Sequence, residues 1–384
     1  MEKVSVIIPS YNHGKFLKKA IDSVLSQTYE EFELIILDDC STDNSAKIIN
    51  SYRDKRIRKY FNKINNGAVN TLNQLIDLAN GEYIALLNSD DYWSNDKLEK
   101  QLNYLEKNPN VGACFTWADF VNDHGKYIYD LEYAPTDLFQ KKNKTNSQWF
   151  RYFFENGNCL CHPSVMIRKD IYDKLGKYKS IYRQLPDFEF WIRLIKRYNI
   201  HIIEENLVHF RILSGEQKNS SFLDQNNKNL MNYEMYTIKK NFFDNCDDSL
   251  FINAFSDVII NKNCIRNSDM ISFEKAIILY DSKYYKQLGR FIGYEKLGKI
   301  LESEISRNII ENNYNFYLKD YYLLGEKIVN LDVQYFEYSV IEKIPDNIAN
   351  SRFYRWSNKI YNSKIYNLIL RLRINYRKLY KKIK

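Results

Sequence analysis

Short apolar runs and helix-like patterns alternate along the first half of the chain. Runs at residues 4–9, 33–37, 56–61, 83–87 and 111–116 are bounded by turn residues, which is typical of strands buried on both faces of a parallel sheet. Between them, apolar residues recur at steps of three and four, as on one face of a helix. A last strand is expected at 207–211. The alternation predicts an α/β fold with a doubly wound, mostly parallel sheet.

The pattern changes after about residue 215. Asn, Lys, Tyr, Phe and Ile dominate there, proline is almost absent until Pro345, and apolar residues recur at helical spacing. We therefore expect an α/β domain over residues 1–215, an α-helical accessory domain over 216–350 and a separate C-terminal helix over 351–384. The sequence does not indicate what the accessory domain does.

The C-terminal helix is distinguished by its charge. Residues 352–384 hold eleven Lys and Arg and no acid, so the rest of this +8 chain sums to −3. Apolar residues fall on one face of the expected helix: Ile365, Leu368, Leu372, Tyr376, Leu379 and Ile383. Such a helix is expected to bind an anionic membrane surface; alternatively, its apolar face packs on the accessory domain. Nucleic acid is not an expected partner, because the basic charge is confined to this segment.

Several protein classes are disfavoured. The first strand is not followed by the G-x-G-x-x-G loop of dinucleotide-binding dehydrogenases, and the sequence has no P-loop. The chain enters its first strand directly and has no uncharged apolar run long enough to cross a bilayer. We therefore expect a cytoplasmic protein, peripheral on the inner face of the cell membrane. Six scattered cysteines without a Cys-x-x-Cys pair are expected to be free thiols.

Acids mark the ends of two strands. The run 33–37 ends in Asp38 and Asp39, and the run 83–87 ends in Asn88-Ser89-Asp90-Asp91. In open α/β sheets ligands bind beyond the carboxyl ends of the strands, and Mg²⁺ commonly bridges one or two carboxylates to substrate phosphates. The alternative is that these acids only cap the following helices.

A further acid, Asp187, opens a helix whose apolar stripe contains Phe188, Trp191 and Ile192. An acid at a helix N-terminus is ordinarily a cap. The helix dipole also keeps the carboxylate ionised, as a general base requires.

Six segments in this order carry a resemblance: Pro9–Asn12, Asp38–Asp43, Gly81–Ile84, Asn88–Asp91, Cys161–Arg168 and Pro186–Arg193. Together they resemble the family 2 glycosyltransferases of the GT-A fold, over residues 1 to about 215. Each motif alone is weak, whereas their order and spacing make the resemblance specific.

The resemblance implies roles for individual residues. The positions implied at the nucleotide sugar are Pro9, Tyr11, Asp39, Gly67, Asn88 and Arg211. Asp90 matches the metal-binding acid of the DxD motif, with Asp91 as a helper, and Asp187 matches the general base. A tyrosine ring can stack on a base, and a carboxylate can accept from an imide N–H. For Arg211 the alternative to a pyrophosphate contact is an ion pair with a strand-end acid.

The chain departs from the family pattern at three positions. Asn88 stands where the first Asp of the DxD motif is usual, Pro186 replaces a Glu, and Leu213 replaces a histidine able to bind the metal. His209, on the same side of its strand as Arg211, is a possible substitute. On the acceptor side, the residues expected to pack or orient are His162, Glu189 and Trp191.

These observations predict an inverting glycosyltransferase that uses Mn²⁺ or Mg²⁺. The expected donor is a UDP- or dTDP-sugar, and the expected acceptor is a hydroxyl of a glycan or lipid-linked glycan in bacterial surface polysaccharide assembly. The alternative is a non-catalytic module that binds nucleotide sugars or glycans. Asp90 and Asp187 favour the enzyme, whereas Asn88 and Leu213 favour the alternative.

Overall fold

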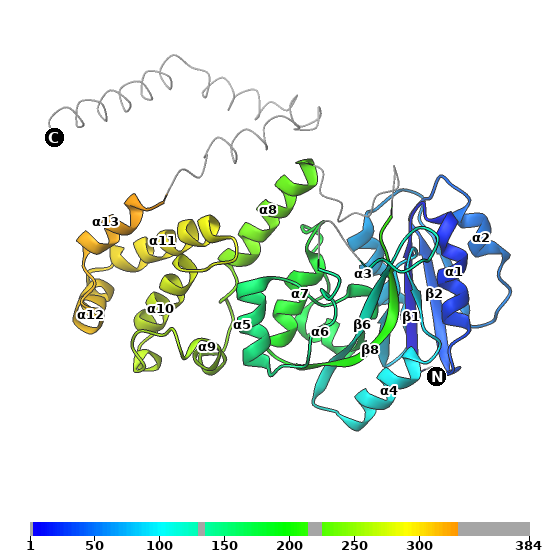
Figure 1. Cartoon of the computed structure of the whole chain (residues 1–384), viewed down its shortest axis with the longest axis horizontal. Coiled ribbons are helices and arrows are strands. Elements are labelled where there is room, and N and C mark those ends of the chain that lie inside the picture. The colour runs from blue at the N-terminus through cyan, green and yellow to red at the C-terminus, as the bar shows by residue number, and fades with distance from the viewer. Residues whose placement is uncertain (1–2, 130–134, 214–224, 329–384) are drawn as a thin grey trace, which may run out of the picture. The chain divides into compact units, whose positions relative to one another are not determined.

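The computed structural model describes residues 3–129, 135–213 and 225–328 (Figure 1). Residues up to Lys327 form one compact unit. The expected C-terminal helix over 351–384 lies outside the described residues. All six cysteines lie within the described ranges and are free thiols.

In the part of the chain that the structure describes, eight strands form a single sheet in the order β3-β2-β1-β4-β7-β6-β8-β5. Strands β1 to β4 are mutually parallel, as are β6 and β8, whereas β7 runs antiparallel to β4 and β6, and β5 runs antiparallel to β8. The mostly parallel α/β fold predicted from the sequence is confirmed. The strands span these residues: β1 Val4–Ser10, β2 Phe32–Asp38, β3 Ile57–Phe61, β4 Tyr83–Leu86, β5 Tyr92–Trp93, β6 Val111–Val121, β7 Met166–Arg168 and β8 Asn199–Arg211.

Helices flank the sheet and continue beyond it (Figure 1). The α-helices span these residues: α1 Gly14–Leu25, α2 Ser45–Ser51, α3 Ala68–Leu78, α4 Lys97–Lys107, α5 Asn146–Asn156, α6 Asp170–Leu175, α7 Pro186–Ile195, α8 Gln225–Lys240, α9 Asp248–Phe255, α10 Ser268–Tyr280, α11 Lys286–Glu302, α12 Glu304–Tyr314 and α13 Leu318–Glu326. Two short 3₁₀ helices cover His162–Ser164 and Cys264–Arg266. After residue 215 the described residues form short helices joined by turns, as the sequence predicts. In the ranges that the structure describes, no helix is long and apolar enough to cross a membrane.

The two faces of the sheet are covered by different helices because side chains alternate along each strand. Val4, Val6 and Ile8 of β1 face a cluster with α1, α2 and α4. Ile7, between them, faces a second cluster built on α3, α5 and α7. This is why the strands read as continuous apolar runs.

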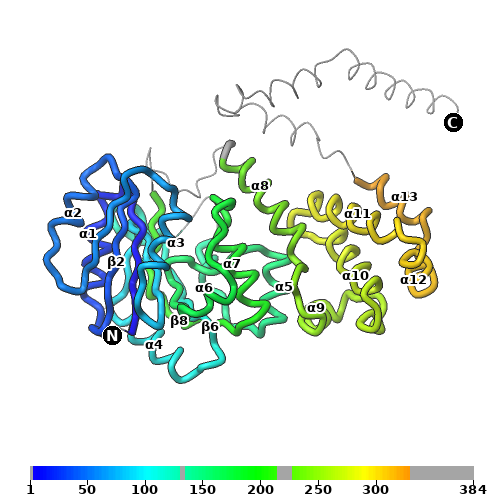
Figure 2. The backbone as a smooth tube through the Cα atoms, turned by 180° about the vertical axis from the view of Figure 1, so that it is seen from behind, coloured from blue at the N-terminus to red at the C-terminus, as the bar shows by residue number. Residues whose placement is uncertain are grey.

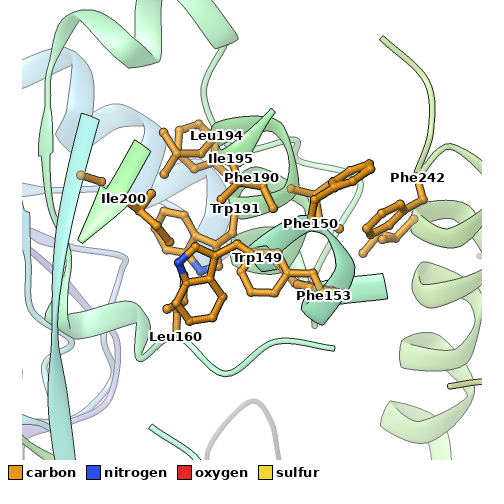
Figure 3. Packing of buried hydrophobic residues seen from close by; sticks show 14 of the residues in the cluster. Trp149, Phe150, Phe153, Leu160, Phe190, Trp191, Leu194, Ile195, Ile200 and Phe242 are labelled. Carbon is orange, nitrogen blue, oxygen red and sulfur yellow. The ribbon is translucent and has the colours of Figure 1, made fainter. Parts of the chain in front are cut away.

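The second cluster extends from the sheet into the helical region. Phe150 of α5 lies between Trp191 of α7 and Phe242, which follows α8, and Trp149 and Phe153 of α5 belong to the same cluster (Figure 3). The ring centroids of Phe150 and Phe242 are 4.7 Å apart. The same cluster continues into α9, α10 and α11, which lie on the far side of α5 from the sheet (Figure 2). The domain boundary expected near residue 215 is thus not marked by a break in the core, and the division into domains stays a prediction.

Candidate active site

The carboxyl ends of β1, β2 and β4 bring three of the predicted segments to one edge of the sheet. β1 pairs with both β2 and β4, with Ser10 opposite Asp38 and Ile7 opposite Leu86. The Asp39 N–H donates to the Ser10 carbonyl over 2.8 Å, so the β1 and β2 loops start in contact. The loop after β4, which carries the acids, lies beside them because β1 is central to this part of the sheet.

The buried carboxylate of Asp39 organises the loop that leads into α3. Its oxygens accept from the main-chain N–H groups of Asn66 and Gly67, each at 2.9 Å, and from Asn62 Nδ2 at 2.8 Å. Gly67 has φ of +83°, a conformation that L side chains rarely adopt. Three of the roughly four acceptor directions of this carboxylate are thus taken by the protein. One direction is left for the predicted contact with a nucleobase.

Tyr11 presents its ring at the start of the β1–α1 loop and is 44 % exposed. The next residue, Asn12, has φ of +52°, and its Oδ1 accepts from the Thr42 N–H over 2.8 Å. Pro9 lies within β1, opposite Leu37. The loop is therefore fixed by its neighbours while the Tyr11 ring remains accessible for stacking.

The two acids after β4 have different surroundings. Asp91 is 1 % exposed, and its carboxylate accepts from the Arg211 N–H at 2.7 Å and from Asn88 Nδ2 at 3.1 Å. Asp90 is 6 % exposed and lies 3.9 Å from His13 Nδ1. Burial raises the pKa of both carboxyls, and the charge of Asp90 adds to the rise in the pKa of Asp91. A cation beside this pair would favour ionisation of both acids.

Arg211 holds the turn that carries these acids. It is 4 % exposed, and its Nε and Nη1 donate to the carbonyls of Asp90 and Asn122 over 2.8 and 2.7 Å. Its guanidinium also lies 4.7 Å from the centre of the Phe16 ring. These contacts fix the main chain of the acidic turn.

Two histidines near this turn have distinct partners. His209 stacks on Tyr92 with ring centroids 4.5 Å apart, and its Nδ1 lies 3.8 Å from Asp119. The imidazole close to Asp90 is that of His13, which is also 2.8 Å from the Ser89 hydroxyl. Leu213 is buried. An imidazole therefore lies beside the acid, but it comes from the β1–α1 loop.

The residues present fit a cation that is held largely by its substrate. Among the residues that the structure describes, no group of three or more His, Cys, Asp or Glu side chains is placed to hold a metal ion. Asp90 and His13 provide one carboxylate and one imidazole. Mg²⁺ in nucleotide sites is commonly bound by one or two carboxylates, with phosphates and water completing its shell.

Asp187 lies in the first turn of α7, after Pro186 at the first helical position. Its Oδ2 accepts from Asn158 Nδ2 over 2.8 Å. Burial raises the pKa of the Asp187 carboxyl to about 6, although its hydrogen bonds to the Phe188 N–H and to Asn158 favour the ionised form. A carboxylate with this pKa is ionised at neutral pH and is a stronger base than an exposed aspartate.

The three acceptor-side residues have packing or orienting contacts. His162 Nε2 lies 3.1 Å from the Tyr178 hydroxyl, and burial lowers the pKa of His162 to about 3. Trp191 is fully buried and meets Phe115 edge-on at 4.9 Å. Glu189 forms ion pairs with Lys179 and Arg193 at 2.7 and 2.8 Å, in the wall of a cavity of about 500 Å³.

Comparison with known proteins shows the family. The model "Glycosyl transferase family 2" matches residues 5–176. An uncharacterized glycosyltransferase of Methanocaldococcus jannaschii is 34 % identical over 260 residues, which cover 66 % of this chain and 84 % of that protein. The chain belongs to glycosyl transferase family 2.

One further relative of this family 2 glycosyltransferase and one solved structure are informative. The Escherichia coli protein named UDP-Glc:alpha-D-GlcNAc-diphosphoundecaprenol beta-1,3-glucosyltransferase WfaP is 30 % identical over 58 % of this chain and 82 % of its own length. The crystal structure of S. aureus TarS 1–349 in complex with UDP-GlcNAc aligns with a TM-score of 0.53 and 16 % identity, covering 82 % of this chain and 91 % of that one. The latter likeness supports the GT-A fold.

Sequence reasoning missed three side chains of this family 2 glycosyltransferase. Asn158 bonds to Asp187, His13 lies beside Asp90, and Glu234 of α8 binds the main chain just before α7. Each belongs to a segment remote in sequence from its partner. The sequence offers only a weak signal for such residues: Asn158, for example, is a polar residue in the turn after a predicted helix and belongs to no periodic pattern.

Proposed function

We propose that the chain is an inverting, metal-dependent glycosyltransferase that moves a sugar from a UDP- or dTDP-linked donor to a hydroxyl group. The observation that carries this proposal is Asp187. Its carboxylate lies in the first turn of α7 with a pKa raised to about 6. It would accept the proton of the acceptor hydroxyl while that oxygen attacks the anomeric carbon from the face opposite the leaving group.

The donor would bind at the edge of the sheet. Tyr11 offers an exposed ring for the base, and Asp39 holds Gly67 and the loop before α3 while keeping one acceptor direction for an imide N–H. Asn88 donates from Nδ2 to Asp91, and its side-chain oxygen is an acceptor of the kind that a ribose hydroxyl can donate to. Arg211 would act through the acidic turn that its guanidinium fixes.

Asp90 and His13 are the residues that would hold the cation, with Asp91 bracing the turn. When bound, Mn²⁺ or Mg²⁺ neutralises the charge that develops on the departing nucleoside diphosphate. The protein's own part is to place the Asp90 carboxylate at the end of β4, close to the loops that would hold the base.

A lipid-linked or glycan acceptor in bacterial polysaccharide synthesis is supported by two observations. The relative WfaP carries a diphosphoundecaprenol-linked acceptor in its name. Residues 352–384 of this chain hold eleven Lys and Arg and no acid, a composition suited to an anionic membrane surface. A cytoplasmic enzyme, peripheral on the inner face of the membrane, would meet such acceptors there.

The test is a screen of UDP- and dTDP-sugars for release of nucleoside diphosphate, with Mn²⁺, with Mg²⁺ and with EDTA. We expect at least one donor to release nucleoside diphosphate, and we expect this release to depend on the cation. With a glycosylated product in hand, proton NMR of the new linkage should show the anomeric configuration opposite to that of the donor. Retention of configuration would refute the inverting mechanism.

A non-catalytic nucleotide-sugar or glycan-binding module is the second candidate. It is favoured by Asn88, which brings no charge to a cation, and by the buried Leu213. Such a module would bind a nucleoside diphosphate in calorimetry but release none from any donor. The same screen therefore separates the two candidates.

A further inference from the structure

A buried carboxylate from the helical region binds the main chain immediately before the helix that carries Asp187. Glu234 of α8 is 1 % exposed. Its Oε1 accepts from the Arg183 N–H at 2.7 Å, and its Oε2 accepts from the N–H groups of Gln184 and Leu185 at 2.9 and 2.8 Å. Three consecutive main-chain donors thus converge on one charged group, which makes these hydrogen bonds stronger than neutral ones.

Glu234, from another part of the chain, thus contributes to the N-terminal capping of α7. Leu185 occupies the N-cap position of α7 and its side chain makes no capping hydrogen bond. Pro186, at the first helical position, has no N–H to offer. The carboxylate of Glu234 accepts from the Leu185 N–H, a helix-terminal donor that has no partner within the helix, and places a negative charge near the helix N-terminus, where the helix dipole favours one. Asp187 is the second residue after the last N–H that Glu234 binds.

The other end of the same loop is also anchored by a charged side chain. Arg193 of α7 donates from Nη1 to the carbonyls of Leu175 and Gly176 at 2.6 and 2.9 Å, and from Nη2 to the Lys177 carbonyl at 2.9 Å. The loop that runs from Lys177 to Leu185 packs beside α7. Its end next to Asp187 depends on Glu234, so the position of Asp187 depends on α8.

Helix α8 also packs against α7. Met235 and Ile238 are buried in the cluster that contains Phe188 of α7. Gln184 Nε2 adds a bond to Asn227 Oδ1 at 3.2 Å. Because Glu234 is itself buried, and Met235 and Ile238 of the same helix are packed in this cluster, its carboxylate has little freedom to move away from the loop.

Glu234 also acts on Asp187 through its charge. That charge raises the pKa of Asp187, after the larger effect of burial. The other titratable groups that face Asp187 are Tyr178, in the loop before α7, and Cys161, in the loop after α5; burial raises the pKa values of both well above their usual range. They are neutral near pH 6, so the charge of Glu234 is the one that adds to the effect of burial on the pKa of Asp187.

We propose that Glu234 is a positioning residue for Asp187, and that α8 of the helical region thereby completes the catalytic site. This inference rests on the proposed function, in which Asp187 is the general base. It assigns to the helical region a part in the reaction, namely fixing where the base sits and how readily it takes a proton.

The structure offers a matched control. Glu274 of α10 is fully buried and accepts from the N–H groups of Ile260 and Asn261 at 3.0 and 2.8 Å. It repeats the chemistry of Glu234 but binds a loop between α9 and α10. Glu274→Gln should therefore cost stability without affecting the reaction.

The experiment compares full-length Glu234→Gln and Glu274→Gln with the wild type. An amide cannot accept from three N–H groups as a carboxylate does, so hydrogen exchange at residues 183–185 should accelerate in Glu234→Gln and stay unchanged in Glu274→Gln. With the active donor from the screen, kcat should fall about 10- to 100-fold in Glu234→Gln, since small displacements of a catalytic group have effects of this size. The donor KM should remain within about twofold, because the sheet-edge loops are untouched.

The pH dependence separates positioning from a purely structural role. Removing the charge of Glu234 lowers the pKa of Asp187, so the acid limb of the kcat profile should move to lower pH in Glu234→Gln. It should not move in Glu274→Gln, even where the two variants lose similar stability.

Two results would overturn the inference. One is an unchanged kcat and acid limb in Glu234→Gln despite faster exchange at residues 183–185; the other is unchanged exchange at those residues.

If the wild type releases nucleoside diphosphate from no donor, the proposed function fails, and carbon-13 NMR titration of the Asp187 carboxyl decides the inference. A lower pKa in Glu234→Gln alone supports the coupling, and an identical titration in both variants refutes it.

Discussion

Asn158 Nδ2 donates to Asp187 Oδ2 over 2.8 Å, which links the loop after α5 to the first turn of α7. Asn158 is itself fixed, because its Oδ1 accepts from the Leu160 N–H over 3.0 Å. The amide thus points its donor at one oxygen of the acid. A carboxylate has roughly four acceptor directions, so Asp187 can accept from Asn158 and from the main chain and still take the proton of the hydroxyl that we propose it deprotonates.

Asn158→Ala should shift the acid limb of activity to higher pH. The bond from Asn158 favours the ionised form of Asp187, and its loss should raise a pKa that burial already places at about 6. Since the base works only when ionised, activity at pH 6 should fall more than activity at pH 8. A pH profile of kcat for the two proteins measures this. A parallel loss at every pH would show that Asn158 acts only on the fold.

Asp187→Asn should keep the donor site intact while removing the base. Transfer should fall by about 10²–10⁴-fold, the usual contribution of general base catalysis. Calorimetry should give an unchanged affinity for UDP with Mn²⁺, because the residues at the donor edge are not altered. Glu189→Gln is the comparison, since Glu189 is paired with Lys179 and Arg193. Near-normal transfer by Asp187→Asn would contradict the role of Asp187.

Stability should also report on Asp187. The pKa of Asp187 in the folded protein is raised above the usual aspartate value. The fold is therefore more stable when Asp187 is protonated than when it is ionised. This stabilisation is fully present below about pH 4 and is lost as pH rises through about 6. Asp187→Asn should therefore gain in melting temperature, relative to the wild type, between pH 4 and pH 7. A difference that does not depend on pH would contradict the raised pKa.

The two adjacent acids after β4 should respond differently to substitution. Asp90→Asn should abolish Mn²⁺-dependent binding of UDP with little change in melting temperature. Asp91→Asn should cost stability instead, about 1.5–3 kcal/mol for each charged hydrogen bond lost, because its carboxylate accepts from the Arg211 N–H and from Asn88. Calorimetry and thermal unfolding of both variants measure these effects. An unchanged metal-dependent affinity in Asp90→Asn would remove it from the metal site.

The segment after residue 350 should bind anionic membranes. Full-length protein should co-sediment with vesicles containing phosphatidylglycerol at low salt, and a chain ending at Asn350 should not. Each Lys or Arg near such a surface contributes roughly 1 kcal/mol, and salt should weaken the binding. Equal sedimentation of both proteins, or of neither, would contradict the membrane role.

The sequence by itself determined the alternation of the longer strands and helices in the α/β part and the acids at the strand ends. Both depend on local pattern. A buried strand needs a continuous apolar run, and a turn at its end needs polar residues, so β1, β2 and β4 and the turns after them are visible in a single sequence. The short β5 and β7, at two and three residues, carry too little pattern to be predicted from periodicity.

Only the tertiary structure decided which side chains meet. Asp90 and Asp91 are adjacent in sequence, but the Arg211 N–H on β8 fixes the Asp91 carboxylate, while His13 from another loop lies beside Asp90. Asn158 reaches Asp187 across 29 positions, and Glu234 reaches Leu185 across 49. Hydrogen bonds of this kind depend on how distant elements pack. Periodicity along the chain records which face of an element is buried, and it does not record which partner covers that face.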